Sequence, residues 1–263
     1  MISVGIVGMG VIGRHVADAI TTGIPGVALA GVTVRNPARA LGHRALALEA
    51  LVRASDLIVE AATQDALREI APSVLMAGRH LMVLSVGGLV GVLDEWAQLA
   101  EKHGCRILVP SGAIAGLDGM KGAREAGITS VVMETRKPPR GLAGAPWIER
   151  QRIDLGTITT ETLIFEGPAT EAVKAFPANV NVVAAVSLAS IGPEKTRIKI
   201  YAVPGLERNQ HRVTIEGEFG LLRVEIENVP SENPRTGKLS YLSICLRFTL
   251  CMVSPESGSC SGF

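Results

Sequence analysis

Short apolar runs alternate with segments of helical periodicity over the first 110 residues of the chain. The apolar runs predict strands, which are expected at 2–7, 27–34, 56–60, 81–85 and 106–109. Apolar residues spaced three and four apart predict helices between them, at 11–20, 64–76 and 89–102. Strands that alternate with crossover helices are typical of a parallel sheet covered on both faces. The pattern therefore predicts an α/β fold that begins with a Rossmann-like, parallel-sheet domain over residues 1–111.

The pattern changes after residue 111. A helix is expected over 112–127, and alternating polar and apolar positions predict strands at 129–136, 159–166, 196–203, 211–217 and 221–227. An uncharged helix is expected at 178–190, with Pro177 near its first turn. These elements predict a second, α+β domain with a mixed or antiparallel sheet over residues 112–227.

The first predicted strand ends in Gly8, Gly10 and Gly13, which have the G-x-G-x-x-G spacing of a dinucleotide-binding turn. In such turns the first glycine allows a tight turn, the second lets the backbone approach a pyrophosphate, and the third lets helix and strand pack closely. The N–H groups of Val11 and Ile12 would face the phosphates at the start of the next helix. A strand precedes the motif and an amphipathic helix follows it, so the turn predicts binding of NAD or NADP.

The adenosine ribose of such a cofactor is expected near the end of the second predicted strand. An acidic residue about 20 positions after the last glycine of the turn would bind this ribose in NAD, but the strand is followed by Arg35 and Asn36. A guanidinium group there can bind the 2′-phosphate of NADP. An arginine at a strand end is also a common solvated surface residue, so both interpretations of Arg35 stay open.

Composition argues against several other classes of protein. With 26 basic and 25 acidic residues, a formal net charge of +1 and 3% aromatic residues, neither a basic surface nor stacking platforms for nucleic acid are expected. No secretory signal is visible at the N-terminus, and proline, asparagine and serine interrupt the longest uncharged stretch, 175–193. We therefore expect a cytoplasmic protein without a membrane segment. The four cysteines lack metal-ligand spacing, so no metal site is expected.

Histidine titrates near neutral pH, and His211 is the only one of the five histidines that falls in the predicted second domain. It ends a polar segment, 208–211, that leads into a predicted strand. From this position alone, a proton-transfer role and a hydrogen-bonded structural role are equally open. Asn179 and Asn181 lie in an otherwise apolar segment, where a buried amide requires hydrogen-bond partners. Asn179 suits a helix cap, whereas Asn181 is harder to explain as one.

Five segments, in order along the chain, carry a resemblance to a known family. They are SGAIAGLDG at 111–119, ETRKPP at 134–139, FPANVN at 176–181, RNQH at 208–211 and ENVPSENP at 227–234. Together they resemble the L-aspartate dehydrogenases of prokaryotes, over residues 1 to about 240. The resemblance implies a homodimer that oxidises L-aspartate to iminoaspartate with NAD or NADP. Iminoaspartate then hydrolyses to oxaloacetate and ammonia or feeds de novo NAD synthesis.

The resemblance also implies roles for individual residues. In such enzymes the alanine matching Ala115 and the asparagine matching Asn181 contact the cofactor, and the histidine matching His211 is the active-site residue. Oxidation at C2 requires a neutral amine, so a base must take the ammonium proton and donors must fix both carboxylates. His211 can act as that base or activate the water that attacks the imine. The choice of donors stays open among Arg136, Lys137, Lys195 and Thr196.

Two other functions remain as alternatives on sequence grounds. A reductase of the dihydrodipicolinate type has the same order of domains, although the second domain lacks the paired histidines and lysine that would favour it. A non-catalytic sensor that binds NAD(P) is the other alternative, and the intact His211 and Asn181 argue against it.

The C-terminal end departs from the family pattern. The family usually ends in an apolar helix that packs on the nucleotide domain, so residues 228–253 are expected to complete the first domain. Polar and apolar residues nevertheless alternate over 242–253 with a period of two, which predicts a strand. The Ser- and Gly-rich residues 254–263 are expected to be disordered.

Overall fold

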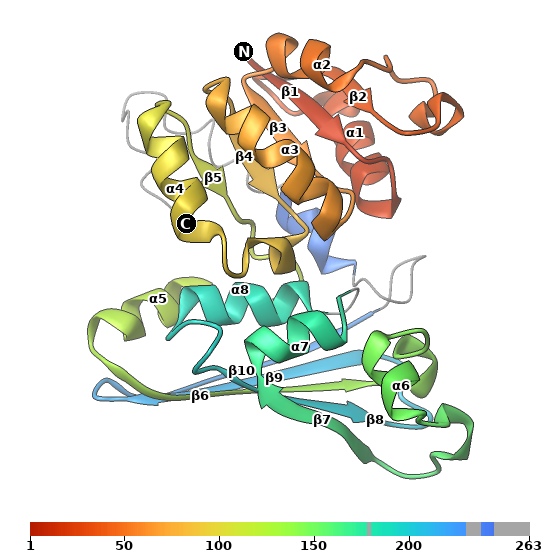
Figure 1. Ribbon diagram of the computed structural model, residues 1–263, viewed down its shortest axis with the longest axis vertical. Helices are drawn as coiled ribbons and strands as arrows, with labels where there is room; N and C mark the ends of the chain where they lie inside the picture. The colour runs from red at the N-terminus through yellow and green to blue at the C-terminus, as the bar shows by residue number, and fades with distance from the viewer. Residues whose placement is uncertain (178–179, 230–237, 245–263) are drawn as a thin grey trace. The chain divides into compact units, whose positions relative to one another are not determined.

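The computed structural model describes residues 1–177, 180–229 and 238–244 (Figure 1). These residues fall into two compact units. Unit 1 combines Met1–Gly112 with the described part of Ser240–Phe263, and unit 2 is the described part of Ala113–Leu239.

Five parallel strands form the sheet of unit 1, in the order β2-β1-β3-β4-β5. They are β1 (Ile2–Val7), β2 (Val27–Thr33), β3 (Leu57–Glu60), β4 (His80–Val83) and β5 (Ile107–Leu108). This sheet confirms the predicted Rossmann-like class. Because the chain order reverses between β1 and β3, the carboxyl ends of these two strands border the place where open α/β sheets bind ligands.

Four α-helices lie within Met1–Gly112 of unit 1: α1 (Val11–Gly23), α2 (Leu48–Ala54), α3 (Gln64–Met76) and α4 (Leu93–Lys102). Helix α3 has the predicted bounds, and the Thr63 hydroxyl caps it by accepting a hydrogen bond from the Ala66 amide at 3.2 Å. The helix predicted at 89–102 starts later, at Leu93, because Val86–Leu89 forms a separate 3-10 turn. Helix α2 was not predicted, since seven residues are too few for the periodicity to stand out.

The described C-terminal segment is helical over residues 239–244. The strand predicted over 242–253 is therefore wrong in the part that can be compared. Tyr241 stacks on His15 of α1 with ring centroids 4.2 Å apart, and Ile244 is 1% exposed within the core of unit 1. The Ser243 hydroxyl accepts a hydrogen bond from the Gly112 amide at 3.0 Å. Packing against the nucleotide domain thus decides the conformation, and the local alternation does not.

The return to unit 1 begins at Ser240 and not at residue 228 as expected. Asn228 is instead the last residue of a strand in unit 2, Gly220–Asn228, and it still pairs with Asn209 of the neighbouring strand. The prediction of disorder over 254–263 lies outside the described residues.

Unit 2 contains a mixed five-stranded sheet with the order β10-β9-β6-β8-β7. Its strands are β6 (Ile128–Lys137), β7 (Thr162–Pro168), β8 (Arg197–Ala202), β9 (Asn209–Gly217) and β10 (Gly220–Asn228). Strands β6 and β8 are parallel, and all other neighbours are antiparallel. The second sheet is therefore mixed, one of the two forms that the sequence predicted.

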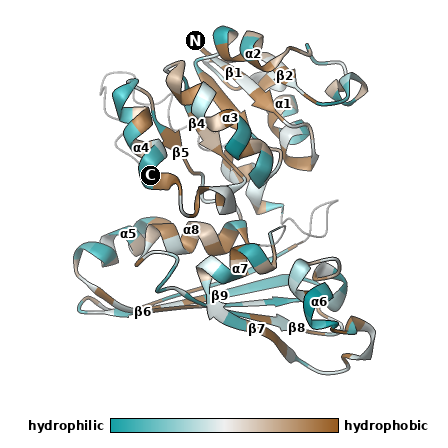
Figure 2. Cartoon of the chain, viewed as in Figure 1, coloured by the Kyte–Doolittle hydropathy of each residue, from teal (hydrophilic) through white to brown (hydrophobic). Residues whose placement is uncertain are grey.

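Helices lie over one face of this sheet (Figure 1). The α-helices of unit 2 are α5 (Leu117–Glu125), α6 (Pro146–Gln151), α7 (Ala169–Ala175) and α8 (Asn181–Ala189). Helix α8 is mostly apolar (Figure 2), and most of its residues are buried. Helix α5 starts later than predicted, because Gly116 adopts a φ of +75° before it, and α8 covers Asn181–Ala189 of the predicted 178–190. The suggested cap Asn179 lies outside the described residues.

None of the helices in the described part of the chain combines the length and apolarity that a membrane span requires.

Candidate active site

The predicted dinucleotide turn connects β1 to α1. Gly8 has a φ of +95°, and a Cβ atom there would lie 2.6 Å from the carbonyl oxygen of Ala61, just after β3. A Cβ atom at Gly13 would overlap the carbonyl oxygen of Gly8. A Cβ atom at Gly10, in contrast, would meet nothing within 4 Å. Gly8 and Gly13 are therefore required for packing, while Gly10 leaves open space at the helix start, as a bound pyrophosphate requires.

Val11 and Ile12 begin α1, a helix of 13 residues whose N-cap residue is Gly10. No side chain caps this helix end, so its first amide groups can donate to an anion. The end of β2 lies beside the turn, because the Gly8 amide donates to the Thr33 carbonyl at 3.0 Å. Arg35 follows two residues later and is exposed. Its position allows the guanidinium group to contact a 2′-phosphate, but the same exposure also fits a solvated side chain.

A buried carboxylate, Glu60, ties together the loops that follow β3 and β4. Its Oε1 accepts hydrogen bonds from the Ala62 amide at 2.8 Å and the Ser85 hydroxyl at 2.9 Å, and its Oε2 accepts one from the Ser85 amide at 2.9 Å. Burial raises the pKa of Glu60, and these hydrogen bonds oppose the rise. Sequence reasoning missed this residue, although an acidic residue at the end of an otherwise apolar strand is a recognisable signal.

The helix-covered face of the unit 2 sheet carries a group of buried polar residues, here called the polar cluster. Its members come from β6, β9 and β10 and are Thr135, Lys137, Asn209, His211 and Asn228. Thr135 lies opposite His211, and Asn228 lies opposite Asn209, in the pairing of neighbouring strands. The other buried polar residues described in unit 2, Ser187, Ser190 and Thr196, donate to nearby backbone carbonyls. These three bonds are local, whereas the polar cluster joins residues of three neighbouring strands, with the contact of Thr135 with His211 running between two of them.

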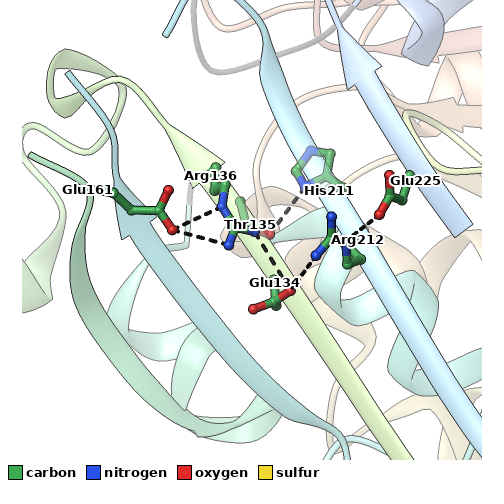
Figure 3. A network of polar contacts seen from close by, with 7 residues as sticks. All are labelled: Glu134, Thr135, Arg136, Glu161, His211, Arg212 and Glu225. Carbon is green, nitrogen blue, oxygen red and sulfur yellow. Dashed lines mark hydrogen bonds and ion pairs between the residues drawn. The ribbon is translucent and has the colours of Figure 1, made fainter. Parts of the chain in front are cut away.

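His211 is held in the polar cluster through one ring nitrogen. The Thr135 Oγ1 atom lies 3.1 Å from Nδ1 of His211 (Figure 3). Burial and, as the smaller cause, the nearby charge of Lys137 together lower the pKa of His211 to about 3. The imidazole is thus neutral at physiological pH. If Nδ1 carries the hydrogen and donates to the threonine oxygen, Nε2 is left as a proton acceptor.

The opposite face of the sheet carries partly exposed ion pairs. Arg136 pairs with Glu161 at 3.1 Å and with Glu134 at 3.7 Å (Figure 3), and it lies over the Tyr201 ring at 4.7 Å. Arg212 follows His211 and pairs with Glu134 at 3.8 Å. Alternation along the strands therefore separates these charges from the neighbouring polar cluster.

Only one of the four candidate carboxylate donors lies near His211. Arg136 points to the opposite face, Lys195 is exposed, and the Thr196 hydroxyl donates to the Gly192 carbonyl at 2.8 Å. Lys137, in contrast, belongs to the polar cluster. The sequence could have indicated that Lys137 is buried, because residues 135 and 137 share a face of the strand with the apolar residues at 131 and 133.

The structure links Ala115 to the sheet that carries His211. The side-chain amide of Asn228 donates to the Ala113 carbonyl at 2.9 Å, and a Cβ atom at Gly116 would lie 3.0 Å from Val224. The exposed Ala115 thus follows a segment fixed on β10. Asn181 is the first residue of α8 and does not act as its N-cap.

A five-stranded parallel sheet with this glycine turn, followed by a mixed sheet with a buried neutral imidazole, defines the class of two-domain nicotinamide-dependent oxidoreductases. Sequence comparison agrees for both parts. Residues 8–110 match the family described as homoserine dehydrogenase, NAD binding domain, and residues 118–249 match the family described as aspartate dehydrogenase, C-terminal.

Full-length relatives specify the family. The L-aspartate dehydrogenase of Methanosarcina barkeri is 46% identical, over 92% of this chain and 94% of its own length. That of Bradyrhizobium diazoefficiens is 42% identical, over 95% of this chain and 93% of its own. The crystal structure of aspartate dehydrogenase from Thermotoga maritima matches with a TM-score of 0.75 and 27% identity, and covers 100% of both chains. The chain belongs to the aspartate dehydrogenase family, which confirms the resemblance indicated by the five segments.

Proposed function

We propose that this protein oxidises L-aspartate at C2 with NAD⁺ or NADP⁺, giving iminoaspartate, which water converts to oxaloacetate and ammonia. The names of the relatives at 42–46% identity support the substrate. The observation in the molecule that supports the reaction is His211, a buried neutral imidazole in a member of this family.

The reaction requires a proton acceptor, and the Nε2 atom of His211 takes this role. Aspartate binds as an ammonium ion, and one N–H proton passes to His211 before the nitrogen lone pair can form the C=N bond. The C2–H bond then breaks, and its electron pair leaves as hydride. Bound NAD(P)⁺ supplies the hydride acceptor. The hydrogen bond between Thr135 and Nδ1 fixes the imidazole orientation. After Nε2 has released the first proton to solvent, the same imidazole can take a proton from the water that attacks the imine carbon.

Cofactor-binding roles are proposed for residues of each unit separately. Gly8, Gly10 and Gly13 and the amides of Val11 and Ile12 hold the pyrophosphate, and Arg35 binds the 2′-phosphate when the cofactor is NADP. The open space at Gly10 supports this assignment. In addition, Ala115 and Asn181 contact the cofactor, as the family resemblance implies.

The assembly, location and metabolic role are also part of the proposal. We expect a cytoplasmic homodimer whose iminoaspartate feeds NAD biosynthesis. Exposed Phe219 and Leu221, at the turn between β9 and β10, offer apolar surface to a second copy. Analytical ultracentrifugation should give twice the chain mass of 27.6 kDa, and a monomer would contradict the dimer.

The direct test is a scan of amino acids and 2-oxo acids with each cofactor, followed by the absorbance of the reduced nicotinamide. The expected result is reduction with L-aspartate and reoxidation with oxaloacetate plus ammonium. Cofactor binding without turnover of any substrate would favour the sensor alternative. Turnover of dihydrodipicolinate in place of oxaloacetate would favour the reductase alternative.

A further inference from the structure

Lys137 is the last residue of β6 and one of the least exposed charged groups in the protein, at 3%. It lies two positions after Thr135, whose hydroxyl contacts His211, so it shares the helix-covered face of the sheet. Among the described residues of unit 2, it is the only charged side chain in the buried class. The polar cluster therefore places a positive charge beside the proposed proton acceptor.

Burying an ammonium group is costly, and an anion that reaches it recovers part of that cost. In addition, the charge of Lys137 disfavours a proton on His211. Both effects mean that the polar cluster is electrostatically suited to a negatively charged ligand. The substrate of the proposed reaction carries two carboxylates, one bonded to C2 and the other to C3.

We propose that the ammonium group of Lys137 binds one carboxylate of the dicarboxylate substrate, next to the amine that faces His211. This inference rests on the proposed function for the identity of the substrate. The other three candidates do not compete for this role, because Arg136 lies on the opposite face of the sheet, Lys195 is exposed, and the Thr196 hydroxyl donates to the Gly192 carbonyl.

The same contact prepares His211 for proton transfer. A carboxylate bound to Lys137 offsets the charge that opposes protonation of the imidazole. His211 therefore becomes a better proton acceptor when the substrate is in place than in the free protein. Lys137 thus binds substrate directly and also couples binding to the proton-transfer step.

Succinate, a dicarboxylate without an amine to oxidise, is a suitable probe. Its dissociation constant would be measured by calorimetry on the full chain with saturating NAD⁺, for the wild type, Lys137→Met and Lys137→Arg. The matched control is Lys199→Met, which removes a lysine that pairs with Glu166 at 3.8 Å on the other face of the sheet. We expect Lys137→Met to weaken succinate binding about 10- to 100-fold, the range for loss of one charge-assisted contact. The arginine variant should bind better than the methionine variant, and the control should match the wild type.

A second readout separates binding from a structural role. Lys137→Met should raise the KM for aspartate while leaving the dissociation constant of NADH, measured by its fluorescence, unchanged. If the methionine variant does not fold, Lys137→Gln takes its place in the same comparison. Unchanged succinate affinity in the neutral variant, equal losses in the neutral and arginine variants, or parallel loss of NADH binding would each overturn the proposal. Succinate binding requires no turnover, so a wild type that binds succinate through Lys137 but does not oxidise aspartate would refute the function and not this site.

Discussion

The buried imidazole of His211 makes the stability of this protein depend on pH in a specific way. In the substitution His211→Asn, the amide can keep a hydrogen bond with Thr135, while the titrating ring is lost. The native pKa of His211 is lowered to about 3, chiefly by burial, whereas in an unfolded chain it is about 6.5. As the pH falls below the unfolded value, the unfolded chain takes up a proton that the native protein excludes, so the free energy of unfolding decreases.

The size of this effect follows from the distance between the two pKa values. At pH 4.5, about two units below the unfolded pKa, linkage gives a loss of about 2–3 kcal/mol that is due to His211 alone. The loss continues down to about pH 3, where the native imidazole also becomes protonated.

Urea denaturation of the wild type and His211→Asn at pH 7.5 and pH 4.5 measures this loss. The wild type should lose about 2–3 kcal/mol more than the variant between the two pH values. A control variant, His103→Asn, changes a histidine outside the polar cluster and should lose as much as the wild type. Equal losses in the wild type and His211→Asn would show that His211 is not held neutral by burial, and the reasoning about its role would fail.

Three further predictions concern separate parts of the molecule. His211→Ala should lower turnover of aspartate by roughly 10² to 10⁴ with little change in cofactor binding, because a proton-transfer group contributes about that much; a variant that keeps more than half the wild-type rate would exclude His211 from the mechanism. Arg35→Asp should shift the ratio of kcat/KM values from NADP toward NAD about tenfold or more through loss of a charge-assisted contact, and unchanged NADP kinetics would indicate a solvated side chain. Ile244→Ala, in the core of unit 1, should lower the free energy of unfolding by about 2–5 kcal/mol, and a variant as stable as the wild type would show that the C-terminal helix does not support the nucleotide domain.

Much of the nucleotide domain is predictable because local signals and packing agree there. Helix α3 matches its prediction at both ends, since apolar spacing and the Thr63 cap give the same answer. The C-terminal segment shows the opposite case. Its alternation over 242–253 predicts a strand, yet the described residues 239–244 are helical, with Tyr241 stacked on His15 and Ile244 buried in the core of the first unit. A period of two is therefore a weaker constraint than the packing of these two large side chains.

The sequence predicted candidate residues for the site, but not which of them lie together on one face of the sheet. The resemblance pointed to His211, and the glycine spacing pointed to the turn. The choice among the carboxylate donors required the register of β6 and β9, because Arg136 and Lys137 are adjacent in sequence and lie on opposite faces. Electrostatic coupling between Lys137 and His211 likewise depends on the pairing of two strands that are far apart in the chain.

The central claim is that hydride leaves C2 of L-aspartate for the nicotinamide. Incubation of the protein with L-[2-²H]aspartate and NAD⁺ or NADP⁺, followed by mass spectrometry of the reduced cofactor, tests it directly. The account predicts that the wild type forms reduced cofactor that carries one deuterium. The variant His211→Ala should form the same product at a rate at least about 10²-fold lower. Reduced cofactor without deuterium, or no reduction with aspartate and either cofactor, would contradict it.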